Sequence, residues 1–406
     1  MSTVTASDLF TAGRGDPYPI YAELRERGGG VHYMEPVNSW VMLRYEDGQR
    51  LSRDRSQWSS DYFGLMGMGA HDPSQPTHQR YAQVMSRNLM MRDAPDHTRL
   101  RKLLNHAFTG KATRVWEPVI ESVVDDVLGA ARVNEEINLF TEIAELIPVM
   151  VVARLIGVPM EDHHLFRHLS LSFALSLDLA VTGDERDRVI EESVQLFDYV
   201  RDLAEEKRNR PADDLLTTLL RAEEDGGKLS LDEIVAQVCM LLVAGNETTA
   251  DLITTGLALF LQHPDQFHAL CEDDALIDPA LLEVLRFESP LQFSPRIAAT
   301  DIPDAGGKTI PEGSNVFFCH GSANRDPRQF DRPDEFDIRR GDKRHLAFAA
   351  GPHFCIGNQL ALTEGAVFFR KLLSMFDRIE LTGEPRLRTD RFNQRGYETV
   401  PITLKR

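Results

Sequence analysis

The stretch from Ser230 to Pro264 constrains the fold most, because it predicts one long helix that a compact chain must accommodate. Ser230 and Glu233 form a capping box, in which each side chain accepts a hydrogen bond from the other residue's backbone N–H at a helix start. The proline at 264 marks where the pattern ends. At 1.5 Å per residue such a helix is about 50 Å long. Since the part from Val238 to Val243 is apolar on most sides, the helix must cross the core.

The middle of this helix interrupts its apolar pattern with small residues, an acid and two alcohols, in the order Ala244-Gly245-Asn246-Glu247-Thr248-Thr249. A mid-helix Gly costs roughly 1 kcal/mol relative to Ala, and Thr hydroxyls can bond back to carbonyls and distort the turn. By its residues alone, the stretch indicates a tolerated helix kink.

A second constraint lies at Cys355, which stands between Gly351 and Gly357 and directly before a segment with apolar residues at helical spacing. Unpaired N–H groups and the dipole at a helix start favour an anionic thiolate. The glycines permit unusual dihedral angles or a close approach to a flat group. This chemistry suits axial thiolate ligation of a haem iron. The alternatives are a small buried cysteine beside turn glycines, or a hydrolase nucleophile paired with His353 or His345.

The cysteine-ligand signature of the cytochrome P450 family, the haem-thiolate monooxygenases, resembles the pattern Phe348, Gly351, His353, Cys355 and Gly357. The chain departs from it at Ala349, where glycine is common, and we expect a small adjustment of the turn without loss of the haem. Further segments from Asp16 to Thr399 follow the family in order and spacing. The resemblance implies a mainly α fold with small β-sheets. It further implies one cytochrome P450 domain over residues 1–406, and a long central helix over a buried haem b whose iron is bound by Cys355.

The resemblance also assigns roles to polar residues outside the signature. His97 and Arg101, four apart and therefore on one helix face, would donate hydrogen bonds to one haem propionate, and Arg296 to the other. Glu247 and Thr248 would deliver protons to dioxygen in a groove of the long helix. The implied haem-binding set is completed by Ala244, Phe348, Gly351, His353 and Gly357.

Glu283 and Arg286 form an i,i+3 pair, which is weak by itself on an exposed helix. Their position ahead of segments 323–327 and 333–336 resembles the structural support of the cysteine side in the family. We therefore assign both residues to the fold and not to catalysis.

The pocket that the resemblance implies is almost wholly apolar, which predicts a hydrophobic substrate held by shape and few hydrogen bonds. Terpenoid, steroid, fatty acid and polyketide all stay open. The segment 59–91 is weakly patterned, with methionines set among glycines, and is interpreted as a substrate-covering loop, a plain surface loop being the alternative. The pocket candidates are Phe63, Leu89, Met90, Phe173, Leu177, Met240, Val243, Leu291, Phe293 and Phe392, the last in a candidate C-terminal hairpin.

Composition narrows the class of protein. The chain has 45 basic and 63 acidic residues, a net charge of −18, which argues against nucleic acid or an anionic membrane as the main partner. Its four cysteines are scattered without CxxC spacing, so neither a disulfide framework nor a zinc cluster is indicated. The first residues do not resemble a signal peptide, and no apolar run is long enough to span a membrane. We expect a cytoplasmic monomer without a membrane anchor.

The 406 residues contain no flavin or nicotinamide domain, so electrons are expected from a separate ferredoxin or flavodoxin with an NAD(P)H-dependent reductase. Such partners are usually acidic, and docking then needs a basic patch. We hypothesise that Lys102, Arg114, Lys343 and Arg344 contribute to this patch. A haem sensor without turnover, which does not need the pair Glu247 and Thr248, and a peroxide-driven peroxygenase, which typically lacks it, are the rival functions.

Overall fold

The computed structural model describes residues 4–10, 15–51, 53–54, 56–61, 72, 74–108, 110–177, 181–222, 229–389, 391 and 393–406. These residues group into two compact units. The first unit comprises 1–59, 124–146 and 248–406, and the second comprises 60–123 and 147–247. Each unit is described by itself. No helix among the described residues is long and apolar enough to cross a membrane.

The long helix α10 runs from Leu231 to Gln262 and contributes residues to both units. Its predicted start is confirmed. The N–H of Ser230 donates to Glu233 Oε2 at 2.7 Å, and the N–H of Glu233 donates to Ser230 Oγ at 3.2 Å. Its end directly precedes His263 and Pro264, as expected. The helix continues unbroken through 244–249. Local capping chemistry was therefore sufficient to fix both ends.

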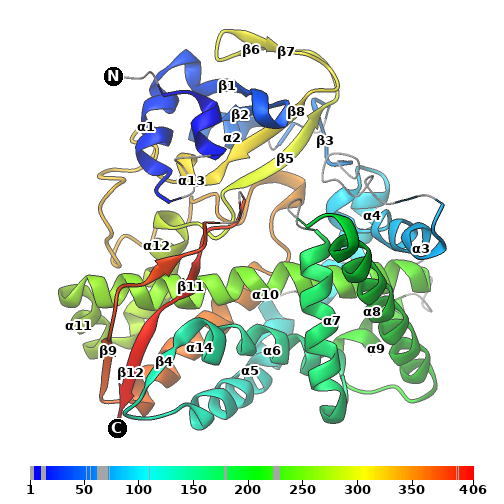
Figure 1. The fold of residues 1–406 in the computed structure, drawn as a ribbon, viewed down its shortest axis with the longest axis vertical. Helices are drawn as coiled ribbons and strands as arrows, with labels where there is room; N and C mark the ends of the chain where they lie inside the picture. The colour runs from blue at the N-terminus through cyan, green and yellow to red at the C-terminus, as the bar shows by residue number, and fades with distance from the viewer. Residues whose placement is uncertain are drawn as a thin grey trace. The chain divides into compact units, whose positions relative to one another are not determined.

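The first unit is built around a five-stranded sheet in the order β1-β2-β8-β5-β3. One sheet face packs against α1 (Tyr18–Glu26), which lies beside the sheet in Figure 1. Tyr21 and Leu24 of this helix share one hydrophobic core with Val41 and Phe293 of the sheet. The other face forms a second core, which includes Trp58, Ala298 and Phe318. The strands are β1 (Val31–Met34), β2 (Ser39–Met42), β8 (Asn315–Cys319), β5 (Phe293–Ala298) and β3 (Trp58–Ser59).

Smaller sheets and helices complete the first unit. The predicted C-terminal hairpin is present as the antiparallel pair β10 (Arg386–Leu387) and β11 (Tyr397–Thr399). Further strands are β4 (Glu136–Asn138), β12 (Pro401–Lys405) and β9 (Arg378–Leu381) in one sheet, and β6 (Ile302–Ala305) with β7 (Lys308–Ile310) in another. The helices are α2 (Tyr45–Leu51), α11 (Pro264–Glu272), α12 (Ile277–Phe287), α13 (His320–Ala323) and α14 (Asn358–Met375).

The second unit is helical, and α7 and α8 lie side by side in it (Figure 1). The loop prediction for 59–91 is wrong over Pro76–Met85, which form helix α3. Tyr81 and Val84 of α3 are buried, and the Tyr81 ring stacks on Phe197 of α8 at 6.0 Å. A tertiary contact thus stabilises a helix whose own pattern is weak. Its helices are α3, α4 (Asp96–Ala107), α5 (Gly110–Ala130, to Val123 in this unit), α6 (Leu146–Ile156, from Ile147 in this unit), α7 (His163–Ser176), α8 (Gly183–Asn209) and α9 (Leu215–Ala222).

Candidate functional site

The turn that carries Cys355 doubles back on itself in the first unit. The N–H of Cys355 donates to the carbonyl of Phe348 at 2.9 Å, and the N–H of Phe354 donates to the carbonyl of Gly351 at 3.1 Å. Gly357 is the N-cap residue of α14, so Cys355 lies just before the helix start, as predicted. The cysteine is only partly buried. The residue therefore combines partial exposure with a position at the favourable end of a helix dipole.

The turn depends on two left-handed residues, Ala349 with φ 58° and Gly351 with φ 73°. We expected a small adjustment of the turn at Ala349, where the family commonly has glycine. The structure instead shows that Ala349 itself adopts the glycine-like conformation. For a residue with a Cβ this conformation costs roughly 1–2 kcal/mol. The contacts around the turn must therefore stabilise this backbone conformation by more than it costs.

Hydrogen bonds from neighbouring segments fix the turn at both ends. Asn324 accepts the N–H of Leu346 at 2.6 Å and donates to Ser289 Oγ at 2.8 Å. At the other end, Asn358 Nδ2 donates to the carbonyl of Cys355 at 2.6 Å. These contacts fasten the backbone on both sides of the cysteine turn.

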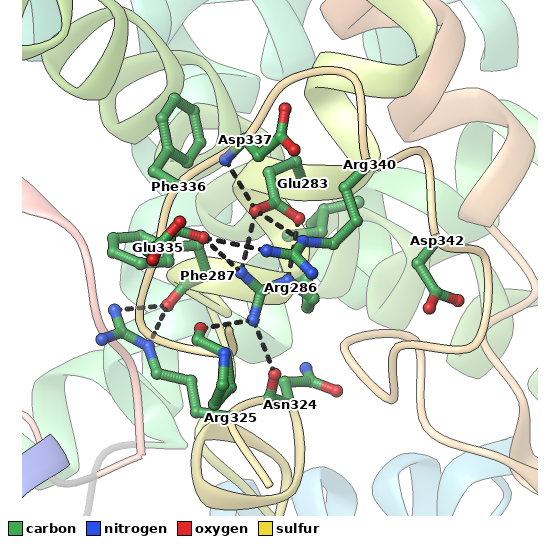
Figure 2. Close-up of polar contacts among 12 residues, drawn as sticks. Glu283, Arg286, Phe287, Asn324, Arg325, Glu335, Phe336, Asp337, Arg340 and Asp342 are labelled. Atoms are coloured by element: carbon green, nitrogen blue, oxygen red, sulfur yellow. Dashed lines mark hydrogen bonds and ion pairs between the residues drawn. The ribbon is translucent and has the colours of Figure 1, made fainter. Parts of the chain in front are cut away.

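A buried charge cluster supports the loop on this side of the unit, as assigned from the sequence. Figure 2 shows Arg286 donating two hydrogen bonds to Glu283, both at 2.8 Å, from adjacent turns of α12. The remaining guanidinium donors of Arg286 reach the carbonyls of Asn324 at 3.0 Å, Pro333 at 2.8 Å and Glu335 at 3.1 Å. One side chain thus fastens three points of the segment that precedes the cysteine turn.

Sequence reasoning missed Arg340, which belongs to the same cluster (Figure 2). Arg340 Nε donates to Glu283 Oε1 at 3.2 Å, and Nη1 donates to the carbonyl of Asp331 at 2.6 Å. The only sequence signal was the doublet Arg339-Arg340, which does not say which guanidinium turns inward.

Arg296, predicted to bind a propionate, lies on β5 and is largely buried. Strand pairing places it opposite Val316, and Ser294 opposite Phe318. Because side chains alternate along a strand, Ser294 and Arg296 share one sheet face and Phe293 lies on the other. Phe293 is 2% exposed and packs edge-to-face on Tyr21 at 6.2 Å. The structure therefore does not support Phe293 as a pocket residue.

The second unit carries the other predicted propionate ligands. His97 and Arg101 lie four residues apart on α4 and so share one helix face, as predicted. His97 is buried, and Arg101 is partly exposed and donates from Nε to Asn105 Oδ1 at 3.0 Å.

The middle of α10 presents a surface of small residues. Ala244 is exposed, although Leu242 before it and Asn246 after it are buried. A Cβ added at Gly245 would meet no atom within 4 Å, and the same holds at Gly357 before α14. Glu247 and Thr248 are half-buried on the same helix.

The remaining pocket candidates differ in accessibility. Met90 is 40% exposed, and Leu177, Val243 and Leu291 are half-buried. Leu89 and Met240 are largely covered. Phe173 is fully buried and contacts Phe197 edge-to-face at 5.4 Å, so the structure places it in the α7–α8 core and does not support its pocket role. Phe63 and Phe392 lie outside the described residues.

Comparisons with known proteins identify the family. The family model "Cytochrome P450" matches residues 67–405. The chain is 33% identical to Cytochrome P450 107B1 of Saccharopolyspora erythraea, with 99% of each protein covered. It is 36% identical to the Vitamin D(3) 25-hydroxylase of Pseudonocardia autotrophica, with 96% of this chain and 94% of the relative covered. The crystal structure of CYP109E1 from Bacillus megaterium with corticosterone matches with TM-score 0.85 and 29% identity, covering 98% of this chain and 100% of that one.

The chain therefore belongs to the cytochrome P450 family and is a monooxygenase of the haem-thiolate class acting on small molecules. Its residues fit such a cofactor. A partly exposed cysteine before a helix start suits an axial thiolate, and a Cβ added at the neighbouring Gly357 would meet no atom within 4 Å. The mainly helical fold with small sheets is confirmed.

Proposed function

We propose that this enzyme inserts one oxygen atom from dioxygen into a C–H bond or double bond of a hydrophobic small molecule, with haem b as cofactor and electrons from a separate redox protein. The observation that carries the proposal is the turn at Cys355, with its left-handed residues and a partly exposed cysteine ahead of α14. Cys239, Cys271 and Cys319 are free thiols, which supports a reducing compartment such as the cytoplasm.

Each residue has a defined part in this proposal. The Cys355 thiolate would be the axial ligand, and the bound haem would supply the activation of dioxygen. Arg296 and Arg101 would neutralise and orient its propionates, because guanidinium groups bind carboxylates bidentately, and His97 would donate a ring N–H to one of them. The exposed methyl group of Ala244 leaves room beside the helix for a flat ring.

Glu247 and Thr248 would move protons toward dioxygen. Both are half-buried on α10, where an acid and an alcohol on successive residues can pass a proton between solvent and a closed site. A haem sensor has no use for this pair, and a peroxide-driven enzyme does not need it. The presence of both residues therefore favours the dioxygen-dependent reaction over the two rivals.

The substrate would be apolar for most of its surface. The accessible pocket candidates, Met90, Leu177, Val243 and Leu291, are all apolar, so binding would come mainly from buried area. The names of two relatives fit this class, since one is a vitamin D(3) hydroxylase and another was solved with corticosterone.

Electrons would arrive from a ferredoxin or flavodoxin. All four proposed docking cations, Lys102, Arg114, Lys343 and Arg344, are exposed, and Arg344 is also paired with Asp342 at 2.6 Å. Reversal of Lys102, Arg114 and Lys343 should slow reduction at low salt, and reversal of Arg344 should do less, because its charge is already neutralised. If the reduction rate is unchanged, the redox partner does not dock on these residues.

The decisive test is the absorption spectrum of the ferrous carbon monoxide complex. A haem-thiolate protein gives a strongly red-shifted Soret band, and Cys355→Ala or Cys355→His should abolish that band. Cys271→Ala is the matched control, since Cys271 is an exposed free thiol on α11, and it should leave the band unchanged. A band retained in Cys355→Ala would refute the proposal.

A further inference from the structure

A buried glutamine of α10, Gln237, binds a neighbouring segment of the second unit at two points. Its Nε2 atom donates to the carbonyl of Arg87 at 2.8 Å, and its Oε1 atom accepts the N–H of Leu89 at 2.9 Å. Gln237 is only 2% exposed, so water cannot easily replace either hydrogen bond. None of the roles assigned above uses this residue.

Gln237 lies on the face of α10 that also carries Ala244 and Thr248. At about 100° per residue, steps of seven and of eleven residues both return to within about 20° of the starting direction. Ala244 is exposed on this face, and Gln237 lies two turns earlier, about 10 Å along the helix axis. The segment 87–89 is therefore bound to the face of α10 that the proposed function gives to dioxygen chemistry.

The segment that Gln237 binds has a fixed backbone and one accessible side chain. Asn88 is fully buried, and its Oδ1 atom accepts the N–H of Met90 at 2.8 Å. Leu89 and Met91 are 7% and 3% exposed, whereas Met90 between them is 40% exposed. Since a ligand need not order a wall that is already rigid, such a backbone favours tight binding.

A glutamine of the first unit makes the same pair of hydrogen bonds and provides a matched comparison. Gln266 of α11 donates from Nε2 to the carbonyl of Phe336 at 2.6 Å, and its Oε1 atom accepts the N–H of Ile338 at 2.8 Å. No ligand contact is assigned to this loop. An effect on ligand binding that follows from Gln237 alone is therefore not a general effect of losing such a pair of hydrogen bonds.

We propose that Gln237 is a positioning residue of the monooxygenase, which holds segment 87–91 against the Ala244 face of α10 and so fixes one wall of the pocket. The inference rests on the proposed function, which makes this segment part of that wall. Without the amide, the carbonyl of Arg87 and the N–H of Leu89 lose their partners, and the segment opens more often. Gln237 acts through the segment that it binds and does not itself contact the ligand.

The first measurement is amide hydrogen exchange of the haem-loaded enzyme, followed by mass spectrometry of peptides that contain Leu89. Gln237→Met retains an unbranched side chain and removes both hydrogen bonds, so exchange at Leu89 should become at least about tenfold faster. Gln266→Met should have this effect at Ile338 and not at Leu89. If exchange at Leu89 is unchanged in Gln237→Met, the glutamine does not hold the segment and the inference is overturned.

The second measurement compares the dissociation constants of imidazole and 4-phenylimidazole. Both bind a haem iron through nitrogen, but only the second has a ring that reaches the pocket wall. The wild type should bind 4-phenylimidazole more tightly. Gln237→Met should reduce this preference about three- to tenfold through weaker binding of 4-phenylimidazole, with imidazole binding unchanged. Gln266→Met should keep the ratio of the two constants at the wild-type value.

A second variant, Gln237→Glu, keeps the inference testable if Gln237→Met does not fold. A protonated carboxyl group can donate to the carbonyl of Arg87 as the amide does, whereas a carboxylate has no proton to donate. Relative to the wild type at the same pH, the preference for 4-phenylimidazole should be nearly normal at about pH 5.5 and reduced at about pH 8.5. A relative preference that does not change with pH would contradict the inference.

The outcomes separate this inference from the proposed function. A wild type without the red-shifted carbon monoxide band means that the proposed function has failed. A wild type that has this band but binds 4-phenylimidazole no more tightly than imidazole overturns the inference alone. A Gln237→Met variant that keeps the wild-type preference, or that weakens both ligands equally, also overturns it.

Discussion

The substitution Glu283→Gln provides a sharp test of how the cysteine side of the fold is supported. It keeps the shape of the side chain and removes one negative charge that faces two guanidinium groups, those of Arg286 and Arg340 (Figure 2). The side chains of Glu283 and Arg286 are 0% and 1% exposed. Solvent therefore cannot compensate for the lost charge.

The expected loss follows from this burial. Removing one partner of a buried ion pair typically costs about 3–5 kcal/mol, because the other charge stays buried without compensation. The amide group would also direct N–H donors at guanidinium donors. A matched control is Glu335→Gln on the same loop, whose carboxylate pairs with Arg332 while both side chains are 60% and 56% exposed. An exposed pair of this kind contributes about 1 kcal/mol or less.

The assay is urea-induced unfolding of the haem-loaded proteins, followed by far-ultraviolet circular dichroism. The midpoint should fall clearly for Glu283→Gln and stay near the wild-type value for Glu335→Gln, with similar slopes. A free energy of unfolding that differs by less than about 1 kcal/mol between the two variants would refute the assignment of a structural role based on burial.

Three further predictions concern the turn, a buried acid and the proton path. Ala349→Gly should raise the free energy of unfolding by up to about 1 kcal/mol, because relief of the left-handed φ of 58° outweighs the added entropy of the unfolded chain. Urea unfolding measures this change, and a variant less stable than the wild type would contradict the prediction. Burial raises the pKa of Glu364 from 4.5 to about 8, so the folded protein keeps a proton that the unfolded chain loses, and the free energy of unfolding should fall as the pH rises through that interval. Glu364→Gln should therefore have a higher free energy of unfolding than the wild type at pH 8, and the two values should converge toward pH 4.5. If the two proteins show parallel pH profiles of the free energy of unfolding, the raised pKa of Glu364 is excluded. Thr248→Ala should uncouple NAD(P)H consumption from product and release peroxide, and unchanged coupling would rule out its role in proton delivery.

Local patterns in the sequence were sufficient for the elements that depend on near neighbours. The capping box at Ser230 and the proline at 264 predicted both ends of α10, since helix termini are fixed by side chains within one turn. The position of Cys355 before a helix start was equally local. The family resemblance added roles that spacing alone does not give.

Tertiary structure decided which side chains share a surface. Phe293 and Ser294 are adjacent in the chain, yet the register of β5 with β8 sends Phe293 into the α1 core and Ser294 to the face of Arg296. In the same way, Phe173 packs on Phe197, and Arg340 joins a cluster that begins on α12. The sequence thus determined where elements begin and that Cys355 lies directly before a helix, because those features depend on contacts within a few residues. Burial, strand register and long-range partners depend on segments far apart in the chain, and only the folded structure brings these together.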